Sequence, residues 1–168
     1  AGVLSPKMGG PGGYPPQPVS VTTEGTYGKF EWATSEGEDR YRRTLYTFMK
    51  RTAPFAMSTT FDAPTGESCL ARREVSNSPL QALTLLNDGM FMEAAQAMAK
   101  VVMTEAQDDD GRLQNIFRRC ATRPAAEDEM GMLKGFLAKQ REKKLEGEAL
   151  WAVVSRAVMN LDEVVVRP

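Results

Sequence analysis

The sequence predicts a mainly α-helical fold: a compact five-helix domain with an irregular proline- and glycine-rich N-terminal arm, long loops and little β-structure. Apolar side chains recur at helical spacing through most of residues 79–160, whereas ten of the first 20 residues are glycine or proline. A chain of 168 residues has room for one modest core. We therefore expect an extended arm over residues 1–35 and a helical domain over residues 36–168.

Composition excludes several classes of protein. The 21 basic and 22 acidic side chains give a net charge of -1, without the basic excess of a nucleic-acid-binding protein. No apolar run approaches the roughly 18 residues of a membrane span. The sequence has no histidine, which excludes Ser-His and Cys-His nucleophile pairs and zinc sites that use histidine. Its two cysteines are too few for a metal cage.

The N-terminal arm cannot continue a helix or a sheet ladder, because proline lacks a backbone donor and glycine costs backbone entropy. It is expected to be either a flexible arm or a polyproline-type strap on the surface of a parent protein, with Tyr14 as an anchor. Residues 19–34 are expected to form one or two short strands or an ordered loop. The chain opens on alanine and shows no signal peptide, so we expect a segment of a longer protein.

A first helix is expected over residues 38–51, where Tyr41 and Leu45 recur at helical spacing and face the core. From residue 40 onward this segment carries five basic side chains and no acid. Arg40 and Arg43 are among them. The basic side is either a solvated helix face or a contact for an anion or an acidic sugar.

Residues 79–103 are expected to be helical with one interruption. Ser78 is a suitable N-cap and Gln81 completes a capping box. The leucines that follow, Leu83 among them, lie on most sides of the first half and predict a buried, central helix. Asp88 stands at the interruption and is expected to cap the second half.

Three further helices are expected over residues 111–121, 126–143 and 147–160, each with an apolar stripe. Three consecutive aspartates at residues 108–110 precede the first of them. They are typical of an acidic helix N-terminus, and a calcium loop is the weaker alternative because the ligand spacing does not alternate.

The densest polar cluster lies between residues 61 and 87. Asp62 and Glu67 are an acid/base pair in one interpretation, if the loop brings them to the separation that glycosidases use. In a second interpretation they pair with nearby arginines and tie the loop to the helix ends. Binding of a ligand is the third. The other polar side chains of this cluster are Arg72, Arg73 and Asn77.

The two cysteines leave two alternatives open. Cys120 lies on an apolar helix face, which favours a buried free thiol. Cys69 lies near two arginines, but no base is at hand to assist a nucleophile. In an exported protein the two residues could instead form a disulfide, a pairing that sequence cannot decide.

Several strings resemble one family over nearly the whole chain. They include Phe-Asp-Ala-Pro at residues 61–64 and Asn-Ser-Pro-Leu-Gln-Ala-Leu at residues 77–83. Further matches are seen at residues 4–11, 37–46, 50–54 and 149–163. Together they resemble the C-terminal region, domain of unknown function 1553, of large planctomycete cytochrome c domain-containing proteins.

This resemblance implies an architecture and no settled activity. Proteins of this kind are exported, so a periplasmic or cell-surface location is implied. They carry a haem-binding domain near the N-terminus, and the haem c of the parent would lie outside this chain. Their association with polysaccharide degradation suggests a carbohydrate link. Two positions depart from the family pattern: Gly66 replaces an arginine, which weakens anion binding by the loop, and Gly89 replaces a proline.

We therefore predict a non-catalytic helical module that packs against the rest of its parent chain or another subunit. The alternatives are a polysaccharide-binding or polysaccharide-degrading site built on Asp62, Glu67 and Arg73, with acidic polysaccharide as ligand, and an accessory domain of a haem electron-transfer protein. We expect no metal, no cofactor in this segment and no catalytic residue. The candidate ligand-binding residues are Arg40, Arg43, Asp62, Glu67, Arg72, Arg73 and Asn77.

Overall fold

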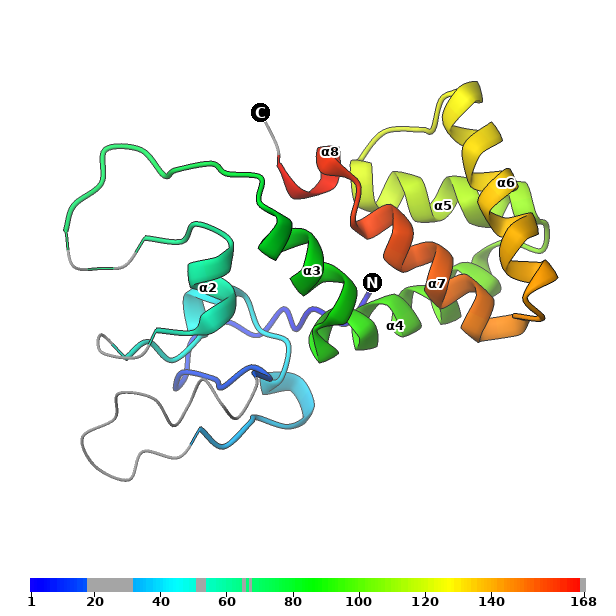
Figure 1. The fold of residues 1–168 in the computed structure, drawn as a ribbon. Helices are drawn as coiled ribbons and strands as arrows, with labels where there is room; N and C mark the ends of the chain where they lie inside the picture. Colours follow the sequence, from blue (N-terminus) through cyan, green and yellow to red (C-terminus); the bar gives the residue numbers. More distant parts are fainter. Residues whose placement is uncertain (18–31, 51–53, 65, 67, 167–168) are drawn as a thin grey trace. The chain divides into compact units, whose positions relative to one another are not determined.

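The computed structural model describes residues 1–17, 32–50, 54–64, 66 and 68–166 (Figure 1). Their fold is mainly helical, as predicted, with an isolated bridge between Gly13 and Thr47 and no strand in these ranges. The short strands or ordered loop expected within residues 19–34 lie largely outside the described residues. No helix of the described chain is both long and apolar enough to cross a membrane.

Contacts divide the chain into two compact units. One comprises Ala1–Gly2 and Ala82–Pro168, and the other comprises Val3–Gln81. We call them the helical unit and the strap unit and describe each by itself. The domain boundary expected at residue 36 stays a prediction, because a division by contacts does not show which segment folds alone.

The helical unit contains four long helices close to the predicted positions. They are α4 (Gly89–Glu105), α5 (Asp109–Ala121), α6 (Glu127–Glu142) and α7 (Gly147–Met159). A short helix, α8 (Asp162–Val165), follows them and was not expected. Helices α4 and α7 pack along each other (Figure 1).

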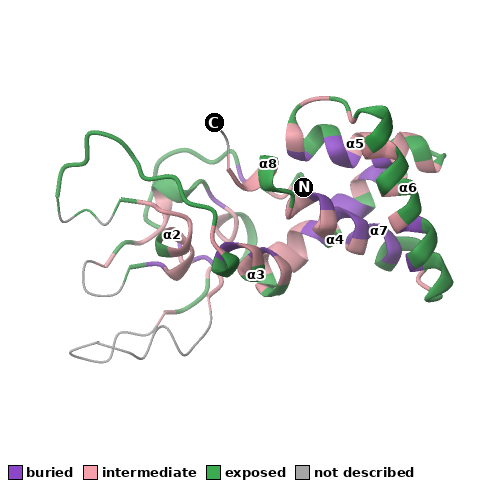
Figure 2. Cartoon of the chain, turned by 45° about the horizontal axis from the view of Figure 1, so that its top comes forward, coloured by how far each residue is buried: buried purple, intermediate pink, exposed green. Residues whose placement is uncertain are grey.

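The core of the helical unit lies between α4, α5 and α7, whose buried residues face one another (Figure 2). Ala95 and Ala99 of α4 and Val154 of α7 are fully buried, so small side chains let the two helices approach closely. Trp151 and Phe117 fill the remaining volume. Burial of each large apolar side chain contributes about 1.5–3 kcal/mol, so this core explains why the helices form here.

Aspartate caps fix two helix starts, and the cap at Asp88 is the one that the sequence predicts. Asp88 accepts a 2.9 Å hydrogen bond from the Met90 amide and separates α4 from α3 (Pro79–Asn87). Asp108 accepts a 3.0 Å bond from the Gly111 amide at the start of α5. The expectation that α3 is buried on most sides is wrong at Leu83, which is 56% exposed.

The helix expected over residues 38–51 is absent from the described part of that segment. The chain forms two 3-10 turns, Gly37–Asp39 and Thr44–Tyr46, and Leu45 is 84% exposed. Aromatic and β-branched residues disfavour helix in this segment, and its backbone groups bond to the arm instead. The arm-binding carbonyls are those of Tyr41 and Tyr46, with bonds of 2.8 and 2.7 Å from the Ser5 and Gly13 amides.

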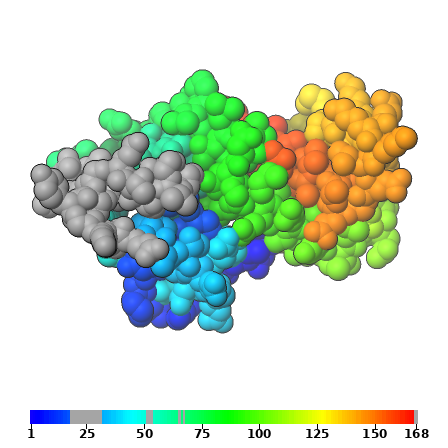
Figure 3. All heavy atoms as spheres, turned by 60° about the horizontal axis from the view of Figure 1, so that its bottom comes forward, coloured from blue at the N-terminus to red at the C-terminus, as the bar shows by residue number. Residues whose placement is uncertain are grey.

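The proline- and glycine-rich arm is a strap held on its own unit (Figure 3). The buried Arg42 side chain donates hydrogen bonds to the backbone carbonyls of Lys7, Gly9 and Pro11. Tyr14 packs against Phe48, with ring centroids 5.0 Å apart. Tyr14 is therefore an anchor, as one of the two interpretations of the arm expects, but the surface that it contacts belongs to the same chain.

Candidate functional site

The loop that carries most of the predicted site residues begins where α2 (Ala56–Thr60) ends. Asp62 has φ 56°, in the left-handed region that aspartate tolerates better than most residues. The Ala63 amide donates a 2.8 Å hydrogen bond back to the Ser58 carbonyl, and Pro64 follows. This arrangement is a Schellman-type helix end, and it fixes the position of Asp62.

The Asp62 carboxylate accepts several hydrogen bonds through one oxygen. Its Oδ2 lies 2.8 Å from the Ser76 amide nitrogen, 2.7 Å from Ser76 Oγ and 3.3 Å from Gln81 Nε2. The bonds from Ser76 are the main reason that the pKa of Asp62 lies below its ordinary value. Asp62 therefore closes the loop on itself as an ionised acceptor.

Gln81 links this loop to the start of α3. Its side chain is 2% exposed and donates 3.0 Å bonds to the Thr60 carbonyl and to Ser76 Oγ. Its Oε1 accepts from the Ser78 amide at 3.0 Å, and its own amide donates to Ser78 Oγ at 3.3 Å. The predicted capping box is thus confirmed, and the same glutamine also joins the Asp62 cluster.

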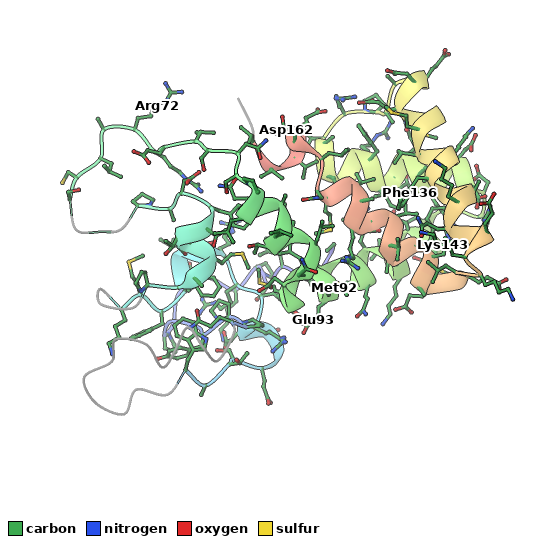
Figure 4. All side chains as sticks on the ribbon, viewed as in Figure 1. Arg72, Met92, Glu93, Phe136, Lys143 and Asp162 are labelled. Atoms are coloured by element: carbon green, nitrogen blue, oxygen red, sulfur yellow. The ribbon has the colours of Figure 1, made fainter. Side chains whose placement is uncertain are left out.

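The arginines of the loop differ in their surroundings. Arg73 Nε donates a 3.0 Å bond to the Asp62 carbonyl, and its Nη2 donates to the Phe61 carbonyl. Arg73 therefore holds the backbone of α2's last turn, whereas the network interpretation expected a carboxylate partner. Arg72 is exposed and projects outward from the loop (Figure 4). Asn77 is exposed as well.

Of the remaining candidates, Arg40 and Arg43 lie outside the Asp62 loop, and Glu67 is not among the described residues. The Arg40 guanidinium donates a 3.2 Å bond to the Tyr41 hydroxyl and lies 5.6 Å from the centre of its ring. Arg43 is exposed. Glu67 falls outside the described residues, so an acid/base pair with Asp62 stays a prediction. Of the seven candidates, the structure brings Asp62 and Arg73 together.

Three residues that matter in the strap unit show no signal, or only part of one, in the sequence. Ser76 stands in a polar stretch with no motif, and nothing in its spacing indicates a bond to Asp62. Gln81 was recognisable as a cap, but its contact with Asp62 depends on how the loop between them folds. Arg42 is one of the five basic residues of segment 40–51, and nothing in the sequence distinguishes it from the others, although it is the buried one among those that the structure describes.

A groove of about 370 Å³ runs beside this loop within the strap unit. Its described lining is partly apolar, with Met49 and Leu70 both more than half exposed. Asp62 and Glu74 contribute carboxylates to it. The remaining lining residues are Pro54, Ser58, Thr59, Ala63, Pro64 and Ser68.

The acidic turn before α5 and the two cysteines are the other residues that metal or redox chemistry would use. Over the described ranges, no three His, Cys, Asp or Glu residues are grouped to hold a metal ion. In the acidic turn, Asp109 forms an ion pair with Arg141 at 2.6 Å, and Asp110 forms one with Lys134 at 2.7 Å. Both ion pairs link α5 to α6. Both cysteines are free thiols, and burial raises the pKa of Cys120.

A c-type haem does not fit the residues of this chain. Its attachment needs two cysteines separated by two other residues, with a histidine directly after the second cysteine. The sequence has two widely separated cysteines and no histidine. Any haem of a parent protein would be held by other segments.

The loop, the capping box and the strap together match a known family. A family model described as "Protein of unknown function (DUF1553)", PSD1, matches residues 1–137. The chain belongs to the DUF1553 family. The matched residues include the strap unit with its Asp62 cluster and end within α6. No curated protein and no solved structure matches this DUF1553 chain.

Proposed function

We propose that this DUF1553 chain is a non-catalytic module that packs against the rest of a longer protein or against a partner subunit. The observation that carries this proposal is the exposure of large apolar side chains in one stretch of the strap unit. Leu70, Val75 and Leu80 are 53%, 61% and 61% exposed. Large apolar side chains that are exposed to water and can be covered by a partner are typical of an interaction surface.

The polar residues of the same loop support a structural role. Asp62 Oδ2 is engaged by Ser76 and Gln81, and Arg73 is engaged by backbone carbonyls. A catalytic carboxylate needs access to the reacting atoms and a pKa suited to proton transfer. The lowered pKa of Asp62 makes it a weak base, which favours the loop as a scaffold for the exposed apolar side chains.

The proposal also covers the location of the protein. By resemblance to its family, we propose that the protein is exported and acts in the periplasm or at the cell surface. Nothing in the described residues favours the polysaccharide alternative or the electron-transfer alternative over the packing role, so both stay predictions.

The test is association of the 168-residue chain with the remainder of its natural protein, supplied as a separate polypeptide and measured by analytical ultracentrifugation. We expect a complex for the wild type and a loss of at least about tenfold in affinity for the double variant Leu70→Ser, Val75→Ser, since buried apolar contacts dominate such interfaces. Met132→Ser is the matched control, because Met132 is 67% exposed on α6. Absence of a complex, or equal loss in the control, would contradict the proposal.

A further inference from the structure

We propose that the groove beside the Asp62 loop binds a basic peptide segment in which a lysine or arginine is flanked by apolar residues. We call this groove, with the lining given above, the acidic groove. The inference rests on the proposed packing function and adds the chemistry of the partner. We argue it from the volume of the groove, from its exposed apolar residues Met49 and Leu70, and from its carboxylates.

The groove has the size of a specific binding site. Its volume of about 370 Å³ lies in the range of clefts that hold small ligands or a few side chains. Met49 and Leu70 are 56% and 53% exposed, so much apolar surface there remains in contact with water. Pro54 and Pro64 extend the apolar lining. Covering this surface with an apolar side chain would contribute about 25 cal/mol for each Å² removed from water.

The charge of the described lining is negative. Asp62 and Glu74 are its charged members, and no lysine or arginine stands among its described residues. Asp62 Oδ2 accepts the bonds from Ser76 and Gln81, which leaves Oδ1 without a hydrogen bond from the described residues. Glu74 is exposed. The groove therefore combines two carboxylates that can accept further hydrogen bonds with the exposed apolar side chains of Met49 and Leu70.

Arg73 is a cation of this cluster, and it bonds to the carbonyls of Asp62 and Phe61. The hydrogen bonds from Ser76 are the main cause of the lowered pKa of Asp62, and the charge of Arg73 adds to them, so that carboxylate stays ionised. The donors of Arg73 are directed at the backbone, so an incoming cation can still approach Glu74. An acidic sugar or acidic peptide would meet two like charges, which costs binding energy.

A peptide with one basic residue between apolar residues would match both the exposed apolar lining and the two carboxylates of the groove. Its ammonium or guanidinium group would bond to Glu74 and to Asp62 Oδ1, while its apolar neighbours would cover Met49 and Leu70. The hydroxyls of Ser58, Thr59 and Ser68 line the same groove and provide partners for the peptide backbone. The acidic groove thus favours a protein partner over an acidic glycan.

The experiment titrates the whole ¹⁵N-labelled chain with the blocked peptide acetyl-Gly-Leu-Lys-Leu-Gly-amide. The comparison peptides carry glutamate in place of lysine, or serine in place of both leucines. We expect shifts at Met49, Leu70 and Glu74 with the lysine peptide alone. Glu74→Gln is expected to weaken binding about three- to tenfold, and 0.5 M salt is expected to weaken it as well. Glu38→Gln, an exposed carboxylate of the same unit, is the control.

Equal binding of the lysine and glutamate peptides, shifts confined to other residues, or no binding at millimolar peptide would overturn the inference. Binding of an acidic oligosaccharide in the same groove would also overturn it. The packing function is tested separately by the Leu70→Ser, Val75→Ser variant. If that variant loses its partner while Glu74→Gln has no effect, the packing function stands and the partner is not basic.

Discussion

Arg42 Nη1 donates a 2.8 Å hydrogen bond to the carbonyl oxygen of Pro11, which lies 31 residues earlier in the chain. The guanidinium also bonds to the carbonyls of Lys7 and Gly9 and lies 4.0 Å from the ring centre of Tyr46. A planar group with five donors can satisfy several carbonyls at once. The described part of the arm, residues 1–17, contains no helix or strand, so this side chain adds to the few backbone bonds that hold it.

Arg42→Lys is expected to destabilise the strap unit by about 1–3 kcal/mol, because an ammonium cannot bond to the same three carbonyls and the buried side chain loses most of its charge-assisted hydrogen bonds. The measurement is hydrogen–deuterium exchange of residues 3–17, together with urea unfolding. Arg43→Lys is the control, since Arg43 is the exposed neighbour and its replacement should change the stability by less than about 0.5 kcal/mol. Unchanged exchange of the arm in the Arg42 variant would show that other contacts hold it.

The pKa of Asp62 tests the hydrogen bonds that close the loop. Ser76→Ala removes the hydroxyl that bonds to Asp62 Oδ2 at 2.7 Å, so the pKa of Asp62 should rise toward its ordinary value. An NMR titration of the Asp62 carboxyl group measures this directly. Ser68→Ala, in the same loop, should leave the midpoint where it is in the wild type. A pKa that stays low in the Ser76 variant would assign the effect to other partners.

The ion cluster at the start of α6 predicts a pH dependence of stability. Arg123 forms paired hydrogen bonds with both Glu129 and Glu163, and its bonds lower the pKa of Glu129 to about 2 from an ordinary value of 4.5. A lowered pKa in the folded state means that the contribution of Glu129 is fully present above pH 4.5. It is lost as the pH falls from about 4.5 to about 2.

Glu129→Gln should therefore flatten the fall in the free energy of unfolding over that pH window, measured by urea unfolding at a series of pH values. Glu127→Gln is the control, because Glu127 also lies in the first turn of α6. Its pH profile should keep the slope of the wild type. If the free energy of unfolding falls in parallel with pH in the Glu129 variant and the wild type, the Arg123–Glu129 pair is not a source of the acid sensitivity.

The helical unit was predictable because its signals are local. The apolar spacing within each helix, the aspartate cap at residue 88 and the acidic turn at residues 108–110 are all visible in neighbouring residues of the sequence. A helix needs little else once a core is available to cover its apolar face. The same holds for the capping box of Ser78 and Gln81. These elements appear within a few residues of their expected positions.

The strap unit was not predictable in the same way, because its signals are distant. Residues 38–51 show helical spacing, yet the backbone of this segment bonds to the arm more than 30 residues away. The burial of Arg42 and the bond between Ser76 and Asp62 likewise arise from chain segments that no spacing rule connects. Candidate residues in a loop can be named from sequence, but their partners depend on tertiary structure.

Ser155 lies in the core of the helical unit with no exposed surface, and its Oγ has no hydrogen-bond partner among the described residues. Ser155→Ala removes a buried polar group without adding volume. We expect unchanged stability or a gain of up to about 1 kcal/mol, measured by thermal or urea unfolding. Ser155→Val adds volume at a buried position of α7 and should cost about 1–3 kcal/mol. A marked loss in the alanine variant would indicate a bond from a buried water.

Glycine replacements should have opposite signs in the two units. Gly131 and Gly135 lie inside α6, and a Cβ at either position would meet nothing within 4 Å. Alanine at each should stabilise the helical unit by about 1 kcal/mol, because glycine loses more backbone entropy in a helix.

A Cβ at Gly13 would lie 2.9 Å from the Asp39 carbonyl oxygen, so Gly13→Ala should destabilise the strap unit by about 1–3 kcal/mol. Hydrogen exchange, which resolves the stability of each unit separately, measures all three variants. A stabilising effect of Gly13→Ala would contradict the close packing of the strap on the Asp39 carbonyl.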